Sequence, residues 1–272
     1  MIDSKEDKLL LARLADKQRQ CEQRQYPVCS DFLDARQQAL AADFFGEKCA
    51  FGFWGGFAAA ERRVLVFLPD YLSADILQQP EGAAEIWPDE ESCPLAVLRA
   101  VPTAKRSGLT HRDYLGALLS LGINRAKLGD ILVQNEPPDD DAERADIVIL
   151  RELADYLLLN FLRAGRCTLQ LELLVPSVLQ MNTPRTENMR LNVSSLRLDA
   201  VAAAAFGVSR TKTAAAVSAG LLAVDGLTVL KPDWELAAGV KITWQGKGKV
   251  CLAEIGGKTR KERIWLEIQK YI

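Results

Sequence analysis

The segment from Ser194 to Lys212 contains an abrupt break between two helical patterns. Apolar residues first recur at the spacing of one helix face: Leu198, Val201, Ala202, Ala205 and Phe206. Gly207 ends this pattern, and Ser209 is a suitable N-cap for a second helix whose start carries Arg210 and Lys212. Because the unpaired N–H groups of a helix start favour an anion, the segment predicts two short helices with a phosphate-binding junction.

The charge of the chain changes sign near this segment. Residues 190–272 hold 13 Lys and Arg against 7 Asp and Glu, whereas residues 1–189 hold 21 against 29. A basic end on an acidic body indicates a polyanionic partner for the C-terminal part. The alternative is a fluctuation of surface charge without functional meaning.

The chain beyond the two helices has the pattern of antiparallel strands joined by basic turns. Asp225-Gly226 is a strong hairpin signal between two short apolar runs. Gly246-Lys247-Gly248-Lys249 and Gly256–Lys261 are further turns, flexible and basic enough to approach a phosphodiester backbone. We therefore expect residues 193–272 to form one α+β domain that binds RNA.

Residues 85–176 alternate in the order strand, helix, strand, strand, helix, strand. We expect strands at 95–101, 129–133, 146–150 and 167–174, and helices at 110–121 and 151–163. This βαββαβ order is that of the ferredoxin-like fold, which RNA-recognition modules use. Because the central strands are aliphatic and lack stacking aromatic residues, we expect any RNA contact here to come from loops and basic side chains: Lys105, Arg106, Arg112, Arg125 and Lys127.

Residues 1–77 are predicted to form an N-terminal α/β domain. It has helices at 4–23 and 30–46, a hairpin around Gly55-Gly56 and a strand at 64–69. Its aromatic residues near Arg62 and Arg63 fit either the two faces of a small sheet or a platform for stacking RNA bases: Phe51, Phe53, Trp54 and Phe57. A polar connector is expected at 78–92 and a linker at 177–192, where prolines and polar residues show little periodicity.

The cysteines and the single histidine give no metal pattern. The six cysteines are scattered without a Cys-x-x-Cys pair, and His111 is the only histidine, so no metal and no cofactor are predicted. No apolar run approaches the ~20 residues of a membrane span. The charged start of the chain does not resemble a signal peptide. We therefore expect a cytoplasmic protein.

Enzyme motifs are incomplete in this sequence. His111-Arg112-Asp113 resembles a kinase catalytic loop, but Leu118 stands where its asparagine belongs. Gly257-Lys258-Thr259 resembles the end of a P-loop, but Leu252 stands where the first glycine belongs. Arg197-Leu198-Asp199 resembles the catalytic segment of pseudouridine synthases, yet it continues into a helix. We predict that the protein is not an enzyme.

The C-terminal pattern, two short helices with a cationic helix start followed by strands and a Gly-Lys loop, resembles the S4-type RNA-binding domain. Motifs in the same order along the whole chain resemble the bacterial YlmH family: Phe32-Leu33-Asp34, Gly55-Gly56-Phe57, Ala60-Glu61-Arg62, His111–Ala117, Leu121-Gly122-Ile123, Gly129-Asp130-Ile131 and Ser195–Asp199. The chain departs from that family at Asp225, where Asn is usual, and at Val240, where Asp is usual.

This resemblance implies a monomeric, non-catalytic protein that binds structured RNA (rRNA and tRNA) on the large ribosomal subunit, in the rescue of stalled ribosomes. The resemblance implies that RNA is bound by Arg197, Ser209, Arg210 and Lys212, flanked by Lys247 and Lys249. We predict further RNA-binding residues at Ser195, Thr213, Lys231, Lys258 and Arg260. Secondary contacts are expected at Arg62, Arg63, Lys105, Arg106, His111, Arg112, Arg125 and Lys127. Two alternatives stay open: an RNA-modifying enzyme that an S4 domain targets to RNA, and a protein scaffold in cell division.

Overall fold

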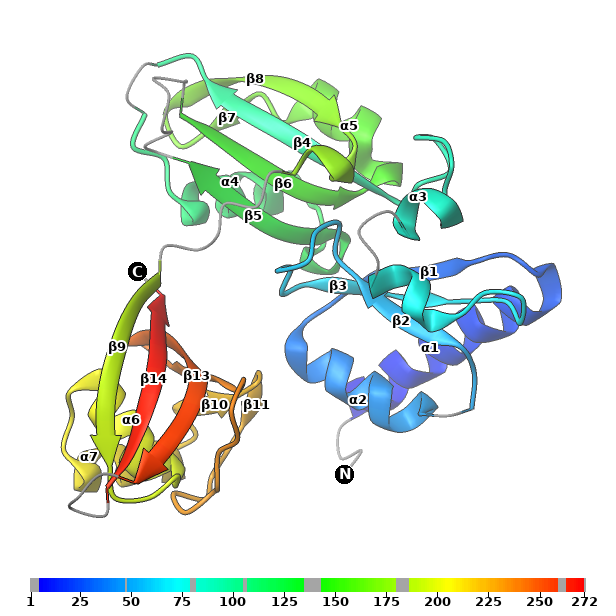
Figure 1. The fold of residues 1–272 in the computed structure, drawn as a ribbon. Helices are drawn as coiled ribbons and strands as arrows, with labels where there is room; N and C mark the ends of the chain where they lie inside the picture. Colours follow the sequence, from blue (N-terminus) through cyan, green and yellow to red (C-terminus); the bar gives the residue numbers. More distant parts are fainter. Residues whose placement is uncertain are drawn as a thin grey trace. The chain divides into compact units, whose positions relative to one another are not determined.

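The computed structural model describes residues 5–46, 48–78, 82–104, 107–134, 143–179, 186–258 and 263–271. The chain divides into two compact units, residues 1–181 and 182–272 (Figure 1). Within the described ranges, no helix combines the length and the apolar character that a membrane span requires. The same ranges hold no group of three His, Cys, Asp or Glu side chains placed to bind a metal ion, and the six cysteines are free thiols.

The first unit begins with a three-stranded antiparallel sheet flanked by two helices. The elements are α1 (Lys5–Arg24), β1 (Val28–Leu33), α2 (Ala35–Phe45), β2 (Phe51–Trp54) and β3 (Arg63–Phe67), with strand order β1-β3-β2. Leu14 and Cys21 of α1 pack with Phe45 of α2 against Leu65 and Phe67 of the central strand. The two helices thus cover one face of this small sheet.

The predicted helix 30–46 is wrong in its first turn. Ser30 lies inside β1, where its buried hydroxyl accepts a hydrogen bond from the Leu65 N–H. The helix starts only after Asp34, which forms a capping box with Gln37. Phe32 and Leu33, which the pattern assigned to the helix, are buried strand residues. The carboxylate and the glutamine three positions on make Asp34 the better N-cap.

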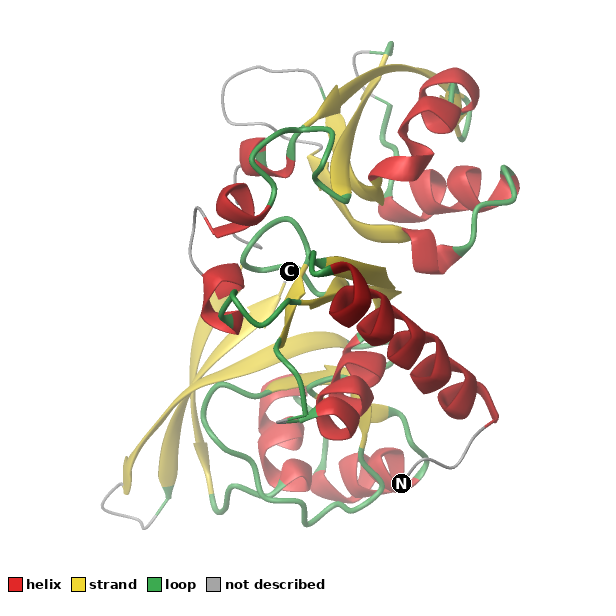
Figure 2. Ribbon diagram, turned by 90° about the vertical axis from the view of Figure 1, so that its right-hand side faces the viewer, coloured by secondary structure: helices red, strands yellow, loops and turns green. Residues whose placement is uncertain are grey.

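The second part of this unit is a five-stranded antiparallel sheet with two helices on one face (Figure 2). Its elements are β4 (Leu95–Pro102), α4 (His111–Ser120), β5 (Leu128–Gln134), β6 (Arg144–Leu150), α5 (Ala154–Asn160), β7 (Arg163–Ala164) and β8 (Cys167–Leu174). The strand order is β5-β6-β4-β8-β7, and short 3-10 turns lie at Arg125–Lys127, Arg151–Leu153 and Pro176–Val178. Leu98 and Ile147 face the helices and pack with Tyr114, Leu118 and Leu157.

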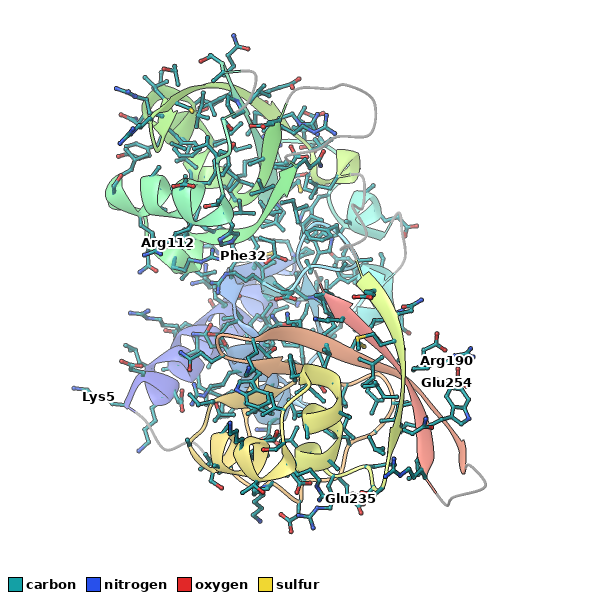
Figure 3. All side chains as sticks on the ribbon, turned by 90° about the vertical axis from the view of Figure 1, so that its left-hand side faces the viewer. Lys5, Phe32, Arg112, Arg190, Glu235 and Glu254 are labelled. Carbon is teal, nitrogen blue, oxygen red and sulfur yellow. The ribbon has the colours of Figure 1, made fainter. Side chains whose placement is uncertain are left out.

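The opposite face of this sheet is covered by the N-terminal sheet. Val97 of β4 and Val148 of β6 share one buried cluster with Phe32, Val64 and Val66. Figure 3 shows Phe32 between the two sheets. The predicted connector 78–92 also contributes: it contains α3 (Gly82–Ile86), which follows a 3-10 turn (Ala74–Gln78), and Trp87, which stacks on Trp54 with 4.8 Å between ring centroids. Trp54 and Phe57 of the aromatic patch therefore pack at this junction.

The second unit is a six-stranded antiparallel sheet with two helices. Its elements are β9 (Thr186–Val193), α6 (Leu198–Phe206), α7 (Arg210–Ser218), β10 (Leu222–Val224), β11 (Leu227–Thr228), β12 (Lys241–Trp244), β13 (Gly248–Lys258) and β14 (Ile264–Tyr271). The strand order is β11-β10-β12-β13-β14-β9. Val201, Ala202 and Val217 of the helices pack on Ile242, Leu252 and Ile268 of the sheet.

The predicted linker 177–192 is wrong in its second half. Residues 186–192 belong to β9, which pairs with β14 from Thr186↔Tyr271 to Val193↔Ile264. Met189, Leu191 and Val193 alternate with polar residues at period two, as in a strand with one buried face. Because the residues on its open face are polar, this edge strand resembles a polar linker in the sequence. The C-terminal unit therefore starts earlier than residue 193.

Candidate RNA interface

The break between α6 and α7 places two helix ends side by side. Gly207 ends α6 in a left-handed conformation, with φ of +64° that favours glycine, and the Val208 N–H donates to the Ala203 carbonyl. Ser209 occupies the N-cap position of α7, but its side chain makes no capping hydrogen bond. Its exposed hydroxyl lies at the helix start, beside Arg210 and Lys212 in the first turn.

Asp199, in the first turn of α6, is the centre of a cationic cluster that joins the start of α6 to the start of α7. The Arg210 guanidinium donates to its carboxylate at 2.9 Å, and Arg197 donates to it at 3.2 Å and 3.4 Å. The Asp199 side chain is 8% exposed, whereas those of Arg197 and Arg210 are 42% and 51% exposed. The buried carboxylate thus holds two guanidinium groups that keep part of their donors on the surface.

Electrostatics keep this carboxylate charged. Burial acts to raise the pKa of Asp199, but the hydrogen bonds from Arg210 and Arg197 outweigh burial, so its pKa lies below the ordinary value. A guanidinium group can form two parallel hydrogen bonds to a phosphate. It is well suited to this when a carboxylate fixes its orientation. Asp199 was not among the predicted site residues. The signal that could have found it is its position two residues after Arg197, on the first turn of a helix.

A short extended segment fixes the start of α6. The Leu198 N–H donates to the Trp234 carbonyl and the Asp199 N–H donates to the Pro232 carbonyl. Arg197 and Glu235 form an isolated antiparallel bridge. These contacts hold the turn that carries the exposed Lys231 against the same helix start as Arg197. Ser195, half-buried, lies just before this segment.

The other predicted RNA-binding residues of this unit differ in how accessible their side chains are to a ligand. Thr213 is fully buried and its hydroxyl donates to the Ser209 carbonyl at 3.1 Å, so the prediction that it contacts RNA is wrong. Lys212 is exposed on α7. The ammonium groups of Lys247 and Lys249 lie over the rings of Trp244 and Tyr271, at 5.5 Å and 5.7 Å from their centroids. The Lys258 side chain and Arg260 lie outside the described residues.

Four of the residues predicted to make secondary RNA contacts instead bind carbonyl or carboxylate groups of the protein itself. Arg62 donates to the carbonyls of Leu128, Phe32 and Arg125, and Arg63 donates to those of Ala60 and Ala58. The bonds of Arg62 hold the N-terminal part against the five-stranded sheet. The bonds of Arg63 stabilise the loop between β2 and β3.

Arg125 and Lys127 serve the same junction. Arg125 donates to the carbonyls of Leu128 and Gly129. The Lys127 ammonium pairs with Asp31 at 2.9 Å and Glu152 at 2.7 Å. The positions of Arg62, Arg63, Arg125 and Lys127 indicate structural roles. Lys105 and Arg106 lie outside the described residues.

His111 and Arg112 open helix α4. Burial, and then the charge of Arg125, lower the pKa of His111. Asp113 closes a capping box, because its carboxylate accepts from the Thr110 N–H at 2.8 Å and from the Thr110 hydroxyl at 2.6 Å. His111-Arg112-Asp113 is therefore the first turn of a capped helix.

Comparisons with known proteins show which proteins this chain resembles. Residues 88–175 match the family model described as "Putative RNA-binding domain in YlmH". Over 252 residues the chain is 30% identical to "Ribosome-associated protein quality control protein P2" of Bacillus subtilis (strain 168), covering 91% of this chain and 90% of that protein. A solved structure, "Cell division protein ylmH from Streptococcus pneumoniae", is 25% identical with a TM-score of 0.45, over 62% of this chain and 92% of that chain.

The second unit and its cationic helix break lie outside the residues that the family model matches, whereas the relative from B. subtilis spans most of both units. The chain belongs to the YlmH family.

Proposed function

We propose that this chain binds structured RNA of the ribosome without catalysis. The observation that carries the proposal is the buried Asp199, which orients Arg197 at the start of α6 and Arg210 at the start of α7. The two arginines place charged donors on the surface where a helix start already favours anions. The name of the relative from B. subtilis, a ribosome-associated quality control protein, supports the ribosome as the partner.

The finer proposal has four parts. Residues 193–272, extended by β9, act as an S4-type module, and residues 85–176 as an RRM-like one. The RNA is rRNA and tRNA on the large subunit. The role is in the quality control of stalled ribosomes in the cytoplasm. The use of Asp113 as a helix cap supports a non-catalytic role for the segment that resembled a kinase loop.

The binding mechanism is electrostatic docking. Arginine donors replace counterions on RNA phosphates, and the released ions make the affinity fall as salt rises. Phosphate contacts position a protein on RNA without reading its sequence. We therefore expect the cluster at Arg197 and Arg210 to set affinity and orientation.

Co-sedimentation of the full chain with large ribosomal subunits at moderate salt tests this function. Arg197→Gln/Arg210→Gln should weaken binding by about 10-fold or more through the loss of charge-assisted hydrogen bonds. Because this variant leaves Asp199 without partners, a second variant, Lys212→Gln/Lys231→Gln, removes nearby exposed charges and leaves the Asp199 cluster intact. Arg13→Gln/Arg19→Gln on α1 is the charge-matched control.

Equal sedimentation of all variants and wild type would refute the proposed site. No sedimentation of the wild type would refute the ribosome as the partner and favour the scaffold alternative. Conversion of a nucleoside in the bound RNA, detected by mass spectrometry of its digest, would refute the non-catalytic proposal.

A further inference from the structure

The RNA-recognition surface usual for a βαββαβ domain is covered in this chain. Such domains present the sheet face that their helices leave open. Here that face of β4 and β6 carries Val97 and Val148, which are buried against Phe32 and Val64 of the N-terminal sheet. Further along the same strands, Arg99 pairs with the buried Asp146 at 2.7 Å. A domain whose family model is described as RNA-binding therefore needs another surface.

A hollow of about 490 Å³ lies on the other side of the domain, between α4 and β7. Its lining is Arg112, Asp113, Gly116, Ala117, Ser120, Arg163 and Gly165. Gly116 forms an open part of the floor, because a Cβ built there meets no atom within 4 Å. Small residues on an exposed helix face let a backbone approach closely.

The two arginines of this hollow differ from Arg125 and Lys127 of the same domain in their contacts. Arg112 and Arg163 are exposed, and neither makes an ion pair or a side-chain hydrogen bond with another described residue. Arg125 and Lys127, in contrast, are held by carbonyls and carboxylates. Figure 3 shows Arg112 pointing outward from the start of α4.

Asp113 reduces the positive charge of the hollow only in part. One of its oxygens accepts both capping hydrogen bonds from Thr110, which ties the carboxylate to the helix start. Arg166, exposed in the turn after Gly165, adds a further positive charge to the β7–β8 hairpin. The lining and this turn together carry three arginines against one aspartate.

We infer that the hollow between α4 and β7 binds the phosphate backbone of RNA, with Arg112 and Arg163 as the phosphate ligands and Gly116 as the floor. This second contact lies on the first unit, apart from the Asp199 cluster of the second unit. It rests on the proposed function, because it assumes that the chain binds RNA. It places an RNA contact of residues 88–175, which match the model of a putative RNA-binding domain, on the helix side of the sheet.

Filter binding of the full chain to large-subunit rRNA transcribed in vitro tests this inference over a range of salt. Arg112→Gln/Arg163→Gln should weaken binding by about 10-fold and reduce the slope of log affinity against log salt by about 1 to 2, since two phosphate contacts are lost. Gly116→Leu fills the floor without a change of charge and should weaken binding as well. Arg13→Gln/Arg19→Gln serves again as the charge-matched control.

The outcomes separate this inference from the proposed function. An affinity and slope of Arg112→Gln/Arg163→Gln equal to those of the control would overturn the inference, and so would unchanged binding by Gly116→Leu. If these variants bind like wild type while Arg197→Gln/Arg210→Gln fails, only the hollow is refuted. The opposite pattern would keep the hollow and refute the site at Asp199. Circular dichroism of each variant verifies that it is folded.

Discussion

The carboxylate of Asp199 and the guanidinium of Arg210 lie 2.9 Å apart across the break between two helices, eleven residues apart in the chain. Arg197 donates to both oxygens of the same carboxylate. Burying the Asp199 carboxylate costs desolvation energy. In return, its hydrogen bonds fix the positions of the two partly exposed guanidinium groups.

Asp199→Asn should lower both stability and RNA affinity. The neutral amide cannot replace the charge-assisted bonds to Arg197 and Arg210, so we expect a loss of about 1–3 kcal/mol in the free energy of unfolding. Affinity for large-subunit rRNA should fall because the arginines lose their fixed orientation. Urea denaturation and filter binding measure the two effects. Glu254→Gln, an exposed carboxylate on β13, is the control, and equal behaviour of both variants would contradict the positioning role.

The contribution of Asp199 should depend on pH in a defined direction. Its pKa is lower in the folded protein than the ordinary 3.8, because the hydrogen bonds from the two arginines outweigh the effect of burial. A group with a depressed folded pKa stabilises the fold fully above its unfolded pKa and loses this contribution as pH falls through the folded value. The stability difference between wild type and Asp199→Asn should be constant from pH 5 to 7 and shrink below about pH 4. Urea midpoints across that range test this; a difference that grows on acidification would give the wrong sign.

Arg62→Met should destabilise the first unit and leave RNA binding unchanged. The Arg62 guanidinium donates to the carbonyls of Leu128, Phe32 and Arg125, and the backbone N–H groups of Arg62 and Glu61 donate to the Asp130 carboxylate. Loss of the guanidinium removes its hydrogen bonds between the two parts of the first unit, at a cost of about 1–3 kcal/mol. Urea denaturation measures the cost, and the salt slope of rRNA binding tests the role. Arg13→Met is the control, and a smaller salt slope for Arg62→Met would restore Arg62 as an RNA contact.

Gly129→Ala and Gly116→Ala should change stability in opposite directions. A Cβ at Gly129 would stand 2.8 Å from the Phe32 ring and 2.9 Å from Val148, so the two sheets of the first unit must move apart, at about 1–3 kcal/mol. Gly116 is an open helix position, where Ala should add about 0.5–1 kcal/mol. Thermal unfolding of the two variants compares them directly. Equal melting temperatures would contradict the close packing of Phe32 on β5.

Local patterns allowed much of the fold to be predicted. Helix α4 lies where Thr110 and the following apolar spacing place it, and the break at Gly207 and Ser209 separates α6 from α7 as expected. The pattern failed at Ser30, because Phe32 and Leu33 suit a helix face and a buried strand equally well. It failed again at Met189 and Leu191, because an edge strand with one polar face resembles a polar linker.

The cationic residues of the candidate site could be predicted from the sequence, but the way they are held together could not. Arg197, Arg210 and Lys212 follow from charge and helix starts, whereas the buried Thr213 and the central Asp199 do not. Arg163 and the hollow beside α4 were not predicted at all. Their signal is weak in the sequence, because Arg163 and Arg112 stand far apart along the chain and meet only when β7 packs beside α4.

Residues close together along the chain were enough to predict the order of helices and strands in most of the chain, the basic character of its C-terminal part and the helix break before Arg210. These depend on residues within a few positions of one another, where periodicity and capping act. Which cations are free to contact a ligand depends on the tertiary fold. Lys127 pairs with Asp31, 96 residues away, while Arg112 and Arg163 stay on the surface. The partner of a charge depends on contacts between distant segments, which no local pattern contains.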